Sequence, residues 1–137
     1  MSSNTKPIGV AYEDQDIVGS DRILSGDELG YAPSAQGAVT QLTSKSTAVT
    51  LNASAGRITM NNAALGATTN VTFTMNNSKI SVNDVVVLSV SENATAGSYN
   101  CWVSGKSAGS VTITLRNISG GSLSEAVVIN FAVIHCV

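Results

Sequence analysis

The sequence predicts an all-β protein: an antiparallel β-sandwich of about eight strands, jelly-roll or immunoglobulin-like, with an extended N-terminal arm. Short apolar stretches with alternating side chains recur along residues 37–137 and are separated by turn residues. No stretch of helical length shows apolar residues recurring at a period of 3.6. Charged residues make up only 12% of the 137 residues, and Ser, Thr, Asn and Gly take their place, as is common in strands and turns.

Residues 1–36 are expected to form the arm. They show no sustained periodicity, and glycines and prolines interrupt short apolar pieces such as residues 17–19 and 22–24. Six of the nine acidic residues lie in this segment with two basic ones, whereas residues 37–137 contain five basic and three acidic residues. This difference in charge predicts two parts with different roles, the arm and a folded sandwich domain over residues 37–137. We expect a neighbouring subunit or a larger surface to hold the arm.

The first half of the sandwich domain contains four expected strands. Residues 38–43 (AVTQLT) end at a Ser/Lys turn, and residues 47–52 (TAVTLN) alternate apolar and polar side chains before an ASAG turn. Residues 57–60 (RITM) form a short strand, and residues 61–68 are a connection of small residues. Residues 70–75 (NVTFTM) alternate cleanly, with Val, Phe and Met on one face and Thr on the other, which indicates one buried face.

The second half contains four more expected strands. Residues 84–90 (DVVVLSV) are strongly apolar, residues 98–103 (SYNCWV) contain the single Trp, and residues 111–117 (VTITLRN) alternate again. The SGGS segment at 119–122 is typical of a hairpin link into the last strand. Residues 124–134 (SEAVVINFAVI) are the longest apolar run, with apolar side chains on both faces, so we expect a central strand covered on both sides.

Residues that could carry out chemistry are few. His135 is the single histidine and stands beside Cys136 in a strand-like segment, so the two side chains point to opposite faces and cannot hold a metal together. A Ser-His-Asp site would have to use His135, and no nucleophile-elbow motif supports one. The acidic stretch 13–16 lacks the spacing of a calcium loop. We therefore expect no catalytic residue, no cofactor, no metal site and no enzymatic activity.

Charge and hydropathy argue against two further classes of partner. A net charge of −2 and a pI near 5.1 give no general attraction to nucleic acid or to an anionic membrane. No run approaches the roughly 18 apolar residues of a membrane span, and the first nine residues lack the apolar core of a signal peptide. In a chain made in the cytosol, Cys101 and Cys136 are expected to be buried free thiols, although pairing stays open if their strands are neighbours.

Three segments, which together span most of residues 37–134, resemble a family of small virion proteins of tailed bacteriophages. Members of that family occur as free-standing head decoration (cement) proteins and as C-terminal modules of phage fibres. The resemblance implies a β-sandwich that forms homotrimers on the phage particle, and it does not extend to residues 1–36. The three segments are GAVTQLTSKSTAVTLNASAGRITM, NVTFTMNNSKISVNDVVVLSV and GSVTITLRNISGGSLSEAVVINFAVI.

Three functions are compatible with this resemblance. A capsid decoration protein, made in the bacterial cytoplasm and placed on the outer capsid surface, would use its arm to bind the major capsid protein or the next trimer. The arm residues expected to make this contact are Tyr12, Ile17, Val18, Ile23, Leu24, Leu29 and Tyr31. A fibre or adhesin module would instead bind a host-surface glycan, with Tyr99 and Trp102 as stacking residues. Such modules usually sit on a coiled-coil or repetitive shaft, and the sequence contains none, which favours decoration. A tail or neck component of the same fold is a third, weaker alternative.

Overall fold

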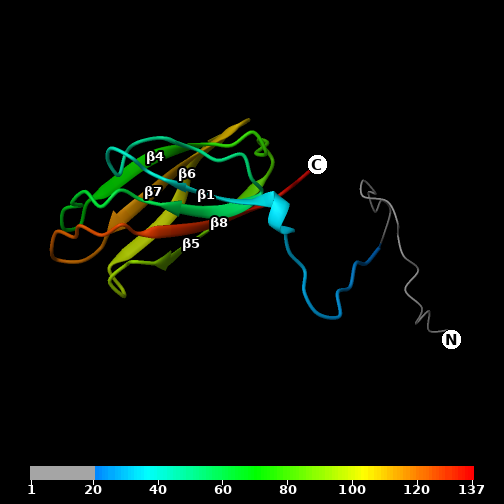
Figure 1. Cartoon of the computed structure of the whole chain (residues 1–137), viewed down its shortest axis with the longest axis horizontal. Helices are drawn as coiled ribbons and strands as arrows, with labels where there is room; N and C mark the ends of the chain where they lie inside the picture. Colours follow the sequence, from blue (N-terminus) through cyan, green and yellow to red (C-terminus); the bar gives the residue numbers. More distant parts are fainter. Residues whose placement is uncertain (1–20) are drawn as a thin grey trace.

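The computed structural model describes residues 21–137, which form a β-sandwich preceded by an extended segment (Figure 1). Within these residues, eight strands and one short 3-10 helix, η1 (Pro33–Ala35), make up the regular structure. The predicted all-β sandwich is therefore confirmed. The first sheet has the order β1-β3-β8-β5 and consists of β1 (Gln36–Thr40), β3 (Ala55–Thr59), β8 (Val128–Ile134) and β5 (Val85–Glu92). The second sheet has the order β2-β4-β7-β6 and consists of β2 (Val49–Thr50), β4 (Asn70–Asn76), β7 (Ser110–Asn117) and β6 (Tyr99–Ser107).

Both sheets are mixed rather than purely antiparallel. The pairings of β3 and β5 with β8, and of β4 and β6 with β7, are antiparallel as expected. The edge strands differ, because β1 runs parallel to β3 and β2 runs parallel to β4. The physical reason is the order in which the chain visits the sheets: β1 to β5 alternate between them, so each of these parallel pairs is joined by a crossover through the opposite sheet.

The one hairpin between consecutive paired strands in residues 21–137 joins β6 to β7, through Ala108 and Gly109. Gly109 has a φ of 78°, a conformation that glycine adopts without steric cost and that tight hairpin turns require. The expectation that residues 119–122 form a hairpin into the last strand is wrong. This segment carries the chain from β7 in the second sheet to β8 in the first sheet, and Leu123 bridges to Leu65 on the way.

The core lies between the two sheets and is built from the inward positions of the alternating strands. Along β4 and β7 every second side chain enters this layer, as the sequence pattern predicts. Burying one such aliphatic or aromatic side chain stabilises the fold by about 1.5–3 kcal/mol. The buried core side chains are Val49, Ile58, Met60, Leu65, Phe73, Met75, Ile80, Val111, Ile113, Leu115, Val127, Ile129, Phe131 and Val133.

Strand β8 is a central strand, as predicted, but only one of its faces is fully covered. Its inward side chains are buried, whereas Asn130 and Ile134 on the outer face are exposed. The expectation of cover on both faces is therefore wrong for the outer face, where no second layer of the described chain packs. There Ile134 pairs with Val85 and Ala132 pairs with Val87 on the edge strand β5. We call these four residues the outer apolar face.

Both cysteines are free thiols, as expected. Cys101 lies in β6 of the second sheet and is partly buried, and burial raises the pKa of its thiol. Cys136 follows β8 of the first sheet and is exposed, so the expectation of a buried thiol is wrong for this residue.

Candidate functional site

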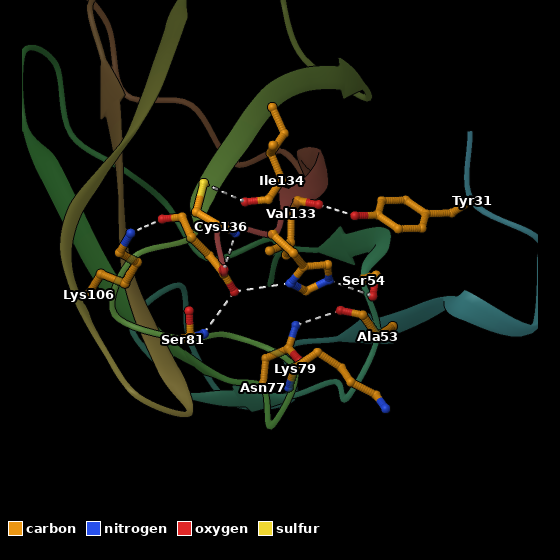
Figure 2. A network of polar contacts seen from close by, with 12 residues as sticks. Tyr31, Ala53, Ser54, Asn77, Lys79, Ser81, Lys106, Val133, Ile134 and Cys136 are labelled. Atoms are coloured by element: carbon orange, nitrogen blue, oxygen red, sulfur yellow. Dashed lines mark hydrogen bonds and ion pairs between the residues drawn. The ribbon is translucent and has the colours of Figure 1, made fainter. Parts of the chain in front are cut away.

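A polar cluster and the base of the arm meet at one end of the sandwich. In Figure 1, η1 and the C-terminal end of β8 lie at this end, and the segment before η1 leads away from it. Four segments that are distant in sequence contribute: the arm, the turn before β3, the turn before β5 and the tail after β8. They bring together Tyr31, Ser54, Asp84 and His135 (Figure 2).

Asp84 is the anchor of this cluster. Its side chain is only 2% exposed. One carboxylate oxygen accepts the Ser81 N–H at 2.8 Å, and the other accepts the Cys136 N–H at 2.9 Å. These two backbone donors, with a further contribution from His135, hold the pKa of the Asp84 carboxyl well below its usual range. Asp84 is therefore ionised near neutral pH and fixes the tail after β8 against the turn before β5.

His135 bridges the Asp84 carboxylate and the Ser54 hydroxyl. Its Nδ1 lies 3.1 Å from Asp84 Oδ2, and its Nε2 lies 3.1 Å from Ser54 Oγ. In the neutral tautomer that carries its proton on Nδ1, the ring donates to the carboxylate and accepts the Ser54 O–H. The His135 side chain is 37% exposed, so this polar chain opens to solvent at its Ser54 end.

Two hydrogen bonds of its backbone hold Ser54 in place. Its N–H donates to the Ala35 carbonyl at 3.0 Å, and its carbonyl accepts the Val133 N–H at 2.8 Å. These bonds tie the turn before β3 to η1 on one side and to β8 on the other. The position of the hydroxyl relative to the imidazole therefore follows from strand pairing rather than from a local motif.

Tyr31 joins the arm to the same place. Its hydroxyl donates to the Val133 carbonyl, and its ring meets the His135 ring edge-on, with 6.3 Å between the ring centroids (Figure 2). The Gln36 side chain donates to the Tyr31 carbonyl at 2.8 Å. A groove of about 400 Å³ runs beside these residues. It is lined by Leu29, Gly30, Tyr31, Ala132, Val133, Ile134 and His135.

The other predicted arm residues are placed very differently from Tyr31. The side chains of Ile23, Leu24 and Leu29 are 65%, 76% and 87% exposed. Tyr12, Ile17 and Val18 lie outside the described residues. The structure thus brings one predicted arm residue onto the sandwich and presents three large apolar side chains to solvent.

The two residues predicted for glycan stacking do not come together. Trp102 lies on the outward face of β6 and is 37% exposed. Tyr99 lies three positions earlier in the same strand, faces inward and packs against the core. Burial, with Glu125 close by, raises the pKa of Tyr99 to about 12. A single stacking platform made of both rings is therefore not formed.

Over residues 21–137, no group of three or more His, Cys, Asp or Glu side chains could hold a metal ion. No helix in this part of the chain is long and apolar enough to cross a membrane. Comparison with protein-family models, with curated proteins and with solved structures finds no match to the chain.

Sequence reasoning considered His135 but found neither of its partners. Ser54 is 81 residues and Asp84 is 51 residues away from it in sequence. At such separations, only the pairing of β3 and β5 on either side of β8 places the three side chains together. The signal that could have found them is the register of that sheet, which the alternation of apolar residues does not specify on its own.

Proposed function

We propose that this chain is a structural virion protein of a tailed phage. In this proposal a homotrimer, made in the bacterial cytoplasm, decorates and stabilises the outer capsid surface. The N-terminal arm grips the major capsid protein or a neighbouring trimer. The resemblance of residues 37–134 to small virion proteins of tailed phages supports the class of protein. The observation that carries the attachment mode is the exposure of Ile23, Leu24 and Leu29 on an extended arm.

Exposed apolar side chains on an arm favour contact with a partner surface, because the free energy falls when large apolar groups are removed from water. One arm offers only a few such groups, so a single contact would be weak. Three arms on one trimer raise the effective concentration of the second and third contacts and so tighten binding without a large interface. Binding to the assembled shell alone then stabilises that state over its dissociated parts.

The outer apolar face supports self-association. Val85 and Ile134 are about half exposed and lie opposite each other on β5 and β8. Strand β5 is also an edge strand, whose unpaired backbone groups proteins usually cover or protect. Contact between subunits along the β5 edge of this face would cover Val85, Val87 and the unpaired strand edge.

The proposal is tested by co-sedimentation of the full chain with expanded capsids that lack it. The test variant combines Ile23→Asp with Leu24→Asp. The matched control combines Leu42→Asp with Val82→Asp, because these two residues of the sandwich domain are similarly exposed. We expect the wild type and the control to saturate the shells and the arm variant to bind at least about tenfold more weakly. Equal binding by all three would contradict an arm-based attachment, and no binding by any would contradict decoration.

The exposed face of Trp102 keeps one alternative open to test, a fibre or adhesin module that binds a host-surface glycan. Under this alternative, Trp102→Ala abolishes binding to host-surface glycans while capsid binding is absent from the start. The same two assays therefore separate the two functions.

A further inference from the structure

We propose that Ser54 is a nucleophile, activated by His135 and oriented through Asp84, which hydrolyses small activated esters at the arm junction. This activity goes beyond the proposed decoration role and does not depend on it. The inference rests on the arrangement of three side chains in the polar network (Figure 2). It also rests on the apolar groove that is lined by one of them, His135.

The connectivity of the three side chains is that of a Ser-His-Asp triad, which is recognised by geometry and roles rather than by sequence position. The buried acid faces Nδ1, and the hydroxyl faces Nε2, both at 3.1 Å. The two backbone donors on Asp84 fix the carboxylate, so the imidazole has one preferred tautomer, with its lone pair directed at Ser54. The triad therefore has a base in reach of the serine proton and a charge that stabilises the imidazolium once it forms.

The nucleophile is accessible, and an apolar groove lies beside its partner His135. The Ser54 hydroxyl and the His135 ring are reached by solvent at the end of the sandwich. The groove that begins at His135 is lined by the apolar side chains of Leu29, Tyr31 and Ile134 and has a volume of about 400 Å³. A short acyl chain or an aryl group fits a groove of this size and chemistry.

The reaction is written in two steps. Ser54 Oγ attacks the ester carbonyl carbon while its proton moves to His135 Nε2; the bond to the leaving oxygen breaks, and the leaving alcohol takes that proton. Water then attacks the acyl-serine, with His135 as the base, and the carboxylic acid leaves with Ser54 restored. No oxidant, reductant or metal is needed.

The structure also limits the substrate class. The Ser54 N–H is bonded to the Ala35 carbonyl, so this group does not help to stabilise an oxyanion, which is a large part of catalysis in serine hydrolases. Substrates with good leaving groups, such as aryl esters, depend least on that stabilisation. We therefore assign activated esters, and not amides, to this site.

The first test uses the full chain with a fluorophosphonate probe, which transfers its phosphonyl group to an activated serine with loss of fluoride, followed by peptide mapping. The control variants are Ser89→Ala and Ser78→Ala, at two exposed serines, one on β5 and one between β4 and β5. We expect one adduct on Ser54 in the wild type and in both controls, and none in Ser54→Ala or His135→Gln.

The second test measures hydrolysis of p-nitrophenyl acetate by the same proteins. Ser54→Ala keeps the bonds of Asp84 to Ser81, Cys136 and His135, so it tests the nucleophile with the surrounding structure intact. We expect it to lower the rate about 100-fold relative to both controls. If the cluster only fixes the tail after β8, the probe should give no adduct, or adducts spread over several serines, and Ser54→Ala should hydrolyse the ester at an unchanged rate. Failure to label Ser54 specifically, or an unchanged rate in Ser54→Ala, would overturn the proposal.

Discussion

The sandwich and the arm contain the same kinds of large apolar side chain in opposite environments. Ile113 in β7 is fully buried, whereas Ile23 in the arm is 65% exposed. The difference lies in the pattern around them. Ile113 belongs to a strand in which every second side chain enters one layer, while the residues around Ile23 have no period that would gather apolar groups on one face. The sandwich is thus stabilised within one chain, whereas the large apolar side chains Ile23, Leu24 and Leu29 of the arm stay exposed.

Tyr31 marks the boundary between these two regions. It contacts the Val133 carbonyl and the His135 ring, while Leu29, two residues earlier, is 87% exposed. The arm is therefore fixed to the sandwich at Tyr31, and the large apolar side chains that precede Tyr31 in residues 21–30 are exposed to solvent. If this comparison holds, substitutions in the sandwich lower the stability of the fold and substitutions at exposed arm positions do not.

The largest effect on stability is expected from a core substitution. Ile113→Ala removes a fully buried side chain and leaves a cavity between the sheets, so the free energy of unfolding should fall by about 2–5 kcal/mol. Leu29→Ala, the matched change in the arm, should alter it by no more than about 0.5 kcal/mol. Denaturant unfolding measures both. A large effect of the arm variant would mean that the arm is part of the fold.

A smaller loss is expected from Asn117→Ala. The fully buried Asn117 amide donates to the Leu65 carbonyl at 2.9 Å and to the Gly121 carbonyl at 2.8 Å, and so fastens the link between the sheets. Its removal leaves two carbonyls without this donor and should cost about 1–3 kcal/mol. Asn70→Ala, at an exposed position in β4, is the control and should be nearly neutral. Equal effects of the two variants in thermal or denaturant unfolding would refute this account of the link.

Acid should weaken the sandwich through its two hydrogen-bonded carboxylates. The pKa values of Asp84 and Glu125 are lowered in the folded chain, by the Ser81 and Cys136 N–H groups and by Thr95 respectively. Carboxyl groups in the unfolded chain have pKa values near 4. As the pH falls toward this value, the unfolded chain therefore binds more protons than the folded chain does. The contribution of these two carboxylates to the free energy of unfolding should be fully present at neutral pH and be lost progressively as the pH falls below about 4.5. The melting temperatures of the wild type and of Asp84→Asn, measured at a series of pH values, should converge as the pH falls. A constant difference between them at every pH would contradict this account.

The smallest effect is expected at the base of the arm. Tyr31→Phe removes the hydrogen bond to the Val133 carbonyl, a contribution of about 0.5–1.5 kcal/mol that is local to the junction. Amide exchange in residues 29–35 should speed up by as much as about tenfold, with the global melting temperature nearly unchanged. Leu29→Ser serves as the control, because its exposed side chain contributes little to the same segment. If Tyr31→Phe unfolds the sandwich or leaves exchange unchanged, the junction is misassigned.

Much of the fold could be predicted from the sequence because alternation is a local property. The observed β4 and β7 match the expected strands to within one residue, since their inward Val, Phe, Met, Ile and Leu side chains are separated by threonines. The partners of a strand are not local. The parallel edges, the crossing at residues 119–122 and the open outer face of β8 all depend on which sheet each strand joins.

The candidate site was harder to predict for the same reason. His135 was visible as the single histidine, but its two partners come from turns that precede β3 and β5. Nothing in the residues around Ser54 distinguishes it from the other serines of this Ser-rich chain. Composition could indicate an arm with apolar anchors. It could not tell that Tyr31 contacts the sandwich whereas the side chain of Leu29 stays exposed to solvent.

The central claim is that the arm, and not the sandwich surface, is the attachment element. Hydrogen–deuterium exchange of the full chain, free and bound to expanded capsids, tests it most directly. The account predicts slowed exchange over residues 21–31 on binding and no change in the sheet formed by β2, β4, β7 and β6. Protection that appears only in the sandwich, with unchanged exchange over residues 21–31, would contradict it.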